Sequence, residues 1–181
     1  PKNKPMPVAI VIGADPLAHI VATAGIKPQD SEAEATGGLR GEPVDLVRCE
    51  TSDLMVPAHA EIVIEAELIP GRIAPDGPFG EYPGYRSGTM CEGVAVKVNA
   101  ITYRNDPIVT MIALGTPPDD SSIAASLSAA VAMKNGLLRH NIPVTDVYVP
   151  PEGVTHLIVI GVTKGGTEVA RKILDYFTAR R

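Results

Sequence analysis

Two carboxylic acids bracket a rigid spacer in the segment APDGPFGEYPGYRSG, residues 74–88. Its prolines fix φ and its glycines permit positive φ or the close approach of a ligand, so the loop can direct Asp76 and Glu81 toward one space. Mutual repulsion and partial burial would raise the pKa of one carboxyl group, which could then donate a proton at neutral pH. The same spacing also fits an ordinary exposed turn with solvated acids.

A third acid, Glu32, lies at the start of an expected helix. Ser31 and Glu34 have the spacing of a capping box, and the helix is expected to end at residues 37–38, which are both glycine. An acid in a first helical turn usually complements the helix dipole, so Glu32 has a structural explanation of its own. A lone histidine such as His59 is more often structural than catalytic.

The elements that position these acids follow from apolar periodicity. Before residue 117 the sequence is mostly strand-forming, and after it strands alternate with helices, as in a small α/β unit. We therefore expect one domain over residues 1–116 and a second over residues 117–181. The expected strands are residues 8–12, 44–50, 61–69, 93–104, 108–114, 144–149 and 156–162, with 93–104 and 108–114 forming a hairpin. The expected helices are residues 17–24, a short one after Ser31, 121–138 capped by Asp119 or Asp120, and 167–178.

Composition excludes several classes of protein. The 181 residues carry a net charge of −5, and their basic residues are scattered, so nucleic acid is not an expected partner. Cys49 and Cys91 form neither a disulfide framework nor a metal-ligand spacing, and they are interpreted as reduced thiols of a cytoplasmic protein. No apolar run approaches the roughly 20 residues that span a bilayer.

Several of these pieces occur together in one known family. The run EAEATGGLRG at residues 32–41, VRC at 47–49, VPAHAEIVIE at 56–65 and GPFGE at 77–81 resemble the UbiD family of prenylated-FMN-dependent decarboxylases. This family includes 3-octaprenyl-4-hydroxybenzoate carboxy-lyase and ferulic acid decarboxylase. The resemblance covers essentially the whole chain, and it implies a flavin-binding split β-barrel followed by part of an α/β C-terminal domain.

The resemblance also implies a reaction and its residues. The family removes CO2 from aromatic or α,β-unsaturated carboxylic acids: the flavin activates the double bond, and a glutamic acid protonates the carbon that CO2 leaves. By this match Glu81 is the proton donor, and Asp76 is its partner, at a position where glutamate is usual. Glu32 matches the glutamate that holds Mn2+ or Mg2+, with K+ nearby, beside the flavin phosphate.

The family's polypeptides are several hundred residues long, and their catalytic arginine and other metal ligands come from a segment that precedes this one. The resemblance therefore implies that the chain is a fragment, inactive alone, of a protein that forms homodimers or homohexamers. Two alternatives stay open: one subunit of a split decarboxylase, or a non-catalytic scaffold or assembly subunit.

Overall fold

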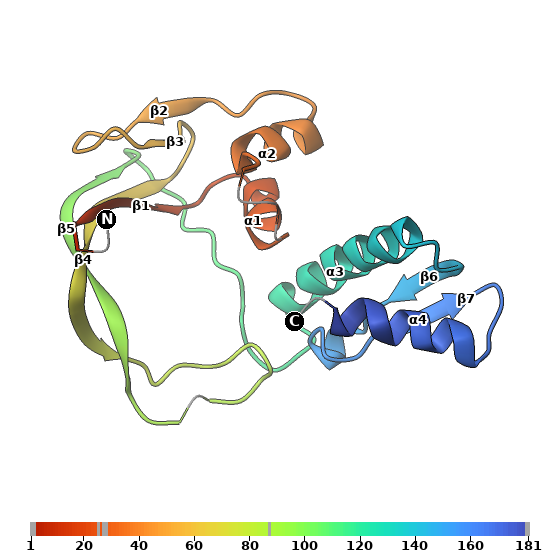
Figure 1. Cartoon of the computed structure of the whole chain (residues 1–181). Helices are drawn as coiled ribbons and strands as arrows, with labels where there is room; N and C mark the ends of the chain where they lie inside the picture. The colour runs from red at the N-terminus through yellow and green to blue at the C-terminus, as the bar shows by residue number, and fades with distance from the viewer. Residues whose placement is uncertain (1–2, 25, 27–28, 87, 180–181) are drawn as a thin grey trace. The chain divides into compact units, whose positions relative to one another are not determined.

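The chain divides into two compact units. A computed structural model describes residues 3–24, 26, 29–86 and 88–179 (Figure 1). One unit contains Pro1–Phe79 and Arg86–Ile112, and the other contains Gly80–Tyr85 and Ala113–Arg181. Helices and strands are mixed, as the sequence predicts, and the sheets formed by the described residues are open rather than closed into a barrel.

The first unit is built on a three-stranded antiparallel sheet of order β1-β4-β5. The strands are β1 (Met6–Ile12), β4 (Ile62–Asp76) and β5 (Cys91–Tyr103). Apolar side chains alternate along β4 because successive residues of a strand point to opposite faces. The register shifts twice between β4 and β5, and such irregularities bend a sheet and increase its twist.

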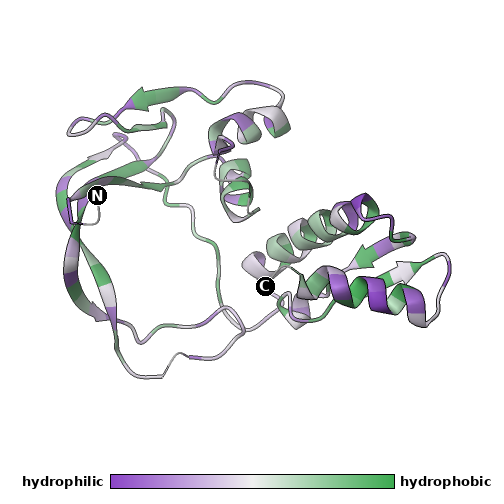
Figure 2. Cartoon of the chain, viewed as in Figure 1, coloured by the Kyte–Doolittle hydropathy of each residue, from purple (hydrophilic) through white to green (hydrophobic). Residues whose placement is uncertain are grey.

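A short hairpin, β2 (Leu46–Arg48) and β3 (Met55–Pro57), supplies the other part of the first unit's core. Cys49, Val56 and Val63 are buried there, and partly buried side chains of β1 pack against them. Figure 2 shows the apolar colouring that runs along β1 and β4. The sequence predicts a strand near β2 but does not predict β3.

Two helices, α1 (Pro16–Thr23) and α2 (Glu32–Arg40), also belong to the first unit. Ser31 caps α2 by accepting a hydrogen bond from the Glu34 amide, as predicted. The prediction that α2 ends at residues 37–38 is wrong. The helix continues to Arg40, and Gly41 caps its C-terminus with the left-handed φ of 82°. Gly37 serves packing instead: a Cβ there would lie 3.1 Å from the carbonyl oxygen of Glu42.

The second unit has helices beside a two-stranded antiparallel sheet. Its elements are α3 (Asp120–Arg139), β6 (Val144–Tyr148), the 3-10 turn η1 (Pro151–Gly153), β7 (Val159–Val162) and α4 (Thr167–Thr178). Asp119 caps α3, so the choice left open between Asp119 and Asp120 falls on the former. The core of the second unit contains Leu137, Ile142, Val144, Val147, Val149 and Tyr176.

The predicted hairpin of residues 93–104 with residues 108–114 is wrong. The first strand forms as β5, but residues 108–114 are not a strand. After Tyr103 the chain leaves the sheet, and the Ile108 amide donates to the Glu61 carboxylate at 3.0 Å instead of to a neighbouring strand. The β-forming composition of residues 108–114 was therefore not sufficient to make them a strand, because no partner strand pairs with them among the described residues. Nor does any described helix have the length and apolarity that a bilayer crossing requires.

Candidate functional site

Asp76 is the last residue of β4 and is held against β5. It pairs in register with Cys91, whose thiol donates to the Asp76 carbonyl oxygen at 3.5 Å. Gly93 leaves room for its side chain, since a Cβ at residue 93 would lie 2.9 Å from the Asp76 Cβ. The side chain of Asp76 is exposed, and its backbone is therefore fixed more firmly than its carboxylate.

Glu81 lies in a tight turn of the second unit. The Glu81 amide donates to the carbonyl oxygen of Tyr85 at 2.7 Å, and the Gly84 amide donates to the carbonyl oxygen of Glu81 at 2.9 Å. Gly84 has φ of 90° and approaches Pro117 so closely that a Cβ would lie 2.6 Å from the proline Cδ. These contacts orient a half-buried glutamate on a backbone that has little freedom.

The spacer between the two acids crosses the boundary of the two units. Asp76, Gly77, Pro78 and Phe79 belong to the first unit, and Gly80 and Glu81 belong to the second. The Gly77–Pro78 peptide is cis, and Gly77 has φ of 81°. No hydrogen bond or ion pair joins any two of Asp76, Glu81 and Glu32 in the described part of the chain.

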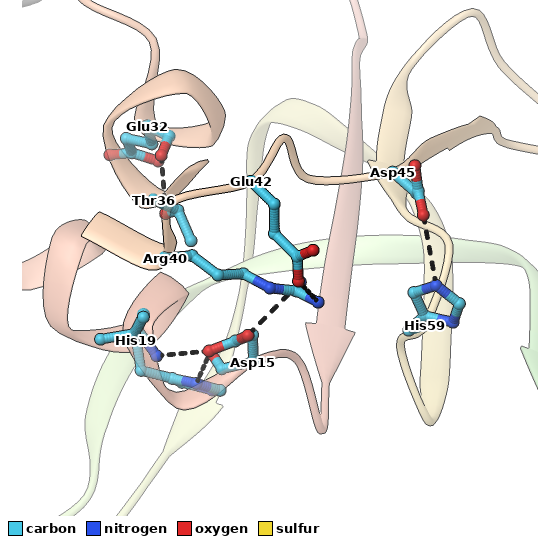
Figure 3. Close-up of polar contacts among 9 residues, drawn as sticks. Asp15, His19, Glu32, Thr36, Arg40, Glu42, Asp45 and His59 are labelled. Carbon is cyan, nitrogen blue, oxygen red and sulfur yellow. Dashed lines mark hydrogen bonds and ion pairs between the residues drawn. The ribbon is translucent and has the colours of Figure 1, made fainter. Parts of the chain in front are cut away.

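Glu32 is exposed in the first turn of α2. Its carbonyl oxygen accepts a hydrogen bond from the Thr36 hydroxyl at 2.7 Å (Figure 3). Its carboxylate makes no hydrogen bond or ion pair with other described residues and is open to solvent. Clusters of three or more histidine, cysteine or acidic residues at metal-binding distance do not occur among the described residues.

A surface groove of about 570 Å3 runs beside α2. It is lined by Ser31, Ala33, Glu34, Gly37, Gly38, the loop from Gly41 to Val44, and Leu46. Glu32 is on the same helix but does not line the groove. The missing Cβ atoms of the glycines bring the backbone of α2 to the groove surface.

Three ion pairs lie on and near the loops around α2. Arg40 lies between Asp15 and Glu42, with N···O distances of 3.6 and 2.7 Å (Figure 3). His59 lies 3.5 Å from a carboxylate oxygen of Asp45, and both side chains are largely exposed. Exposed pairs of this kind contribute little to stability.

Glu65 is a buried carboxylate that sequence reasoning missed. Its oxygens accept hydrogen bonds from the amides of Glu50 and Thr51, each at 2.7 Å, and from the Thr51 hydroxyl. The Thr51 hydroxyl, followed by the two amides, holds the pKa of Glu65 below its ordinary value. Burial, and then the nearby Glu65 charge, raise the pKa of the Cys49 thiol.

A signal for Glu65 was present in the sequence. Glu65 is two residues from Val63 and lies on the same strand face, which contributes to the core, and a charged group on such a face must find hydrogen bonds. The VRC and VPAHAEIVIE motifs are thus in contact. Glu65, the last residue of VPAHAEIVIE, accepts hydrogen bonds from the turn at residues 50 and 51, directly after VRC. This explains the co-occurrence of the motifs by packing.

Comparison with known proteins identifies the family. The sequence model of the UbiD family, described as the 3-octaprenyl-4-hydroxybenzoate carboxy-lyase Rift-related domain, matches residues 1–117. Among solved structures, an evolved dimeric form of the UbiD-class enzyme HmfF from Pelotomaculum thermopropionicum, in complex with prFMN, is 30% identical with a TM-score of 0.84. The match covers 99% of this chain and 41% of that one.

Two further solved structures agree. The vanillic acid decarboxylase ShVdcCD of Sedimentibacter hydroxybenzoicus, in open form, is 33% identical with a TM-score of 0.84 over 95% of this chain and 38% of its own. Apo 3,4-dihydroxybenzoic acid decarboxylase (AroY) of Klebsiella pneumoniae is 26% identical with a TM-score of 0.79 over 97% and 40%. The chain spans about two fifths of the length of these proteins. It belongs to the UbiD family.

Proposed function

We propose that the chain contributes the acid loop and a metal ligand to a prenylated-FMN-dependent decarboxylase of aromatic or α,β-unsaturated carboxylic acids. The observation that supports this most is the GPFGE loop, in which a turn fixes the backbone of Glu81 inside a family match over residues 1–117. The solved relatives include HmfF with prFMN and a vanillic acid decarboxylase. Prenylated FMN, when bound, supplies the electron sink for loss of CO2.

Glu81 is the proposed proton donor. In its protonated form it delivers a proton to the substrate carbon from which CO2 has departed, and the resulting carboxylate regains its proton from solvent. Asp76, at the other end of the spacer, is the proposed partner of Glu81. Because aspartate is one methylene shorter than the glutamate usual here, its reach toward the substrate is shorter.

Glu32 is the proposed ligand for Mn2+ or Mg2+, with K+ nearby. Its carboxylate is exposed and makes no hydrogen bond or ion pair with other described residues, and carboxylate oxygens are the ligands that such hard cations prefer. The carboxylate of Glu32 is therefore a suitable ligand type for Mn2+ or Mg2+. One carboxylate does not complete a metal site, and further ligands must come from other residues. We further propose that residues 1–116 belong to a split β-barrel domain and residues 117–181 to an α/β domain, in a homo-oligomeric enzyme.

A chimera tests the catalytic assignment. Residues 1–181 replace the matching segment of the Sedimentibacter vanillic acid decarboxylase, and the release of CO2 from vanillic acid is measured together with the flavin absorption spectrum. Substituting Glu81→Gln should lower turnover roughly 100-fold or more while flavin remains bound, because a general acid contributes that much. The matched control is Glu92→Gln, an exposed acid on β5.

Turnover of the Glu81→Gln chimera close to that of the parent chimera would refute the role of Glu81. A parent chimera that is folded but binds neither flavin nor Mn2+ would refute the enzyme assignment and favour a scaffold subunit.

A further inference from the structure

The turn that contains Glu81, residues 80–85, belongs to the second unit, although the strands on either side of it in sequence, β4 and β5, belong to the first. Two backbone hydrogen bonds of Glu81, with Gly84 and Tyr85, close the turn. These bonds fix the shape of the turn but not its orientation on the unit that carries it. Contacts with residues 113–181 supply that orientation.

One of these contacts is at Gly84. A Cβ there would lie 2.6 Å from the Pro117 Cδ and 3.3 Å from the Thr116 Cα, so the backbone of the turn packs directly on the segment that precedes α3. This contact is three residues after Glu81. A contact at one end of a turn still allows the turn to rotate about that point, so a second contact is needed to fix the backbone beside Glu81.

The second contact is an aromatic stack at the residue next to Glu81. The rings of Tyr82 and His156 are nearly parallel, with an interplanar angle of 12° and centroids 6.0 Å apart. This geometry is within the range of offset-stacked aromatic pairs, which gain stability beyond the burial of their area. Tyr82 is 46% exposed and His156 is also exposed, so packing of the core does not account for the stack.

The backbone directly before His156 is strained. Val154 and Thr155 have φ of 46° and 66°, in the left-handed region. A β-branched residue in this region is an outlier, and here two follow each other. Strain of this kind persists where the surrounding structure imposes it, and it is concentrated at functional sites.

Local contacts hold this strained loop in place. The side chain of Val154 is buried. The His156 amide donates to the Gly153 carbonyl oxygen at 2.8 Å, and a Cβ at residue 153 would lie 2.8 Å from the Leu157 Cβ. A tightly constrained backbone therefore holds the His156 ring against Tyr82.

We propose that His156 is a positioning residue for Glu81, the proton donor proposed above. Turning the peptide plane between Glu81 and Tyr82 would carry the Tyr82 ring away from His156. The stack and the Gly84 contact thus hold the turn at two points, and the backbone of Glu81 keeps one orientation on the second unit. Proton transfer depends on such positioning, because a displacement of about 1 Å can cost on the order of 100-fold in rate.

The vanillic acid decarboxylase chimera tests this role. His156→Leu should lower kcat roughly tenfold or more and leave KM and the flavin absorption spectrum unchanged, because only the orientation of the proton donor is lost. His156→Phe should recover most of the parent kcat, since a phenyl ring also stacks on Tyr82 but has no titratable nitrogen. The matched control is His59→Leu, at an exposed histidine of the first unit beside Asp45, which should leave kcat unchanged.

The Glu81→Gln background separates positioning of Glu81 from any other role. If His156 acts through Glu81, adding His156→Leu to Glu81→Gln should lower kcat by less than about twofold more, since residues that act as a unit are not additive. A further tenfold loss would overturn the proposal, because His156 would then act independently of Glu81. A parent-like kcat for His156→Leu, or a His156→Phe variant no more active than His156→Leu, would also overturn it.

The inference rests on the proposed function, and the two can fail separately. Full turnover of Glu81→Gln would refute the role of Glu81 and, with it, the positioning role of His156. Loss of turnover in Glu81→Gln together with full turnover in His156→Leu would refute the positioning role alone.

The stack itself is tested in the 181-residue chain without any activity. Tyr82→Leu and His156→Leu should each lower the urea midpoint of the second unit, and the double variant should lose less stability than the sum of the two. The unfolding equilibrium constants should depart from additivity by about two- to tenfold, as expected for an aromatic pair. Additive losses would overturn the proposal, because the two rings would not interact. Should a variant fail to fold, a nuclear Overhauser effect between the two rings of the unsubstituted chain decides instead, and its absence would overturn the proposal.

Discussion

Glu65 shows at the scale of one residue how a buried charge is kept in this fold. Its side chain is almost completely enclosed, and three hydrogen bonds from residues 50 and 51 satisfy its oxygens. A buried carboxylate without such donors would be strongly destabilising. The turn after β2 therefore depends on a residue of β4, and the two parts of the first core are connected by polar as well as apolar contacts.

The depressed pKa of Glu65 predicts loss of stability in acid. The unfolded carboxyl binds a proton near its ordinary pKa of 4.5, and the folded one binds it only at lower pH. The stabilisation is thus present above pH 4.5 and is lost as pH falls through the folded pKa. Urea midpoints measured from pH 7 downward should fall steeply below pH 4.5, and Glu65→Gln should flatten this dependence.

The control for this measurement is Glu67→Gln, two residues along β4 on the same face. Glu67 accepts none of the hydrogen bonds from residues 50 and 51. If Glu65→Gln kept the steep acid dependence of the parent chain, the carboxylate would not be its source.

Gly93 provides a second residue-scale prediction. Because a Cβ at this position would lie 2.9 Å from the Asp76 Cβ, Gly93→Ala must displace the Asp76 side chain. In the vanillic acid decarboxylase chimera, kcat should fall roughly tenfold or more if Asp76 assists Glu81, since small misplacements are costly in catalysis. Gly88→Ala, where a Cβ meets nothing within 4 Å, is the control. Equal kcat values for Gly93→Ala and Gly88→Ala would show that Asp76 does not assist catalysis.

At the scale of elements, caps and special glycines decide where structure begins and ends. The Asp119 side chain caps α3 and also accepts a hydrogen bond from the Gly115 amide at 2.7 Å. This hydrogen bond contributes most to holding the pKa of Asp119 below its ordinary value. The acidic pair at residues 119–120 is therefore explained by the start of a helix. Gly41 ends α2, and Gly84 shapes the turn that contains Glu81.

The turn around Glu81 should be intolerant of a side chain at residue 84. Gly84→Ala adds a Cβ 2.6 Å from Pro117 in a backbone conformation with positive φ, and it should destabilise the second unit by about 1–3 kcal/mol. Urea denaturation followed by circular dichroism measures this. Gly165→Ala, with open space and no positive φ, should change the midpoint little, and similar losses in both variants would exclude the proposed contact.

At the scale of the whole molecule, each unit has its own core. The first is centred on Val56 and Val63, and the second on Leu137 and Val149. Cores that share no residue allow the units to open separately, since local unfolding follows contiguous packing. The acid loop passes from one unit to the other between Phe79 and Gly80.

Gly136 tests this separation. A Cβ at residue 136 would clash with the Tyr176 hydroxyl oxygen, so Gly136→Ala should destabilise the second unit by about 1–3 kcal/mol. Hydrogen exchange should accelerate in α3 and α4 and remain unchanged in β1 and β4. Tyr176→Phe should recover part of the loss by removing the clashing atom. Faster exchange throughout the chain would show instead that the units unfold together.

Local patterns determined much of this protein from sequence alone. The Ser31 and Asp119 caps, the helix Thr167–Thr178 and most strands follow from periodicity and capping, which act within a few residues. Ordered motifs such as GPFGE and VPAHAEIVIE identified the UbiD family. The site roles of Asp76, Glu81 and Glu32 stay predictions, because they rest on that match.

The tertiary structure decided what depends on residues distant in sequence. Glu65 binds amides fourteen and fifteen residues away, and no local pattern specifies such a partner. Residues 108–114 have strand composition but form no ladder, because a strand requires a neighbour that only the fold supplies. Gly37 looked like a helix stop, and its close approach to Glu42 shows that packing required it. Sequence encodes local preference, and three-dimensional contact selects among the structures that this preference allows.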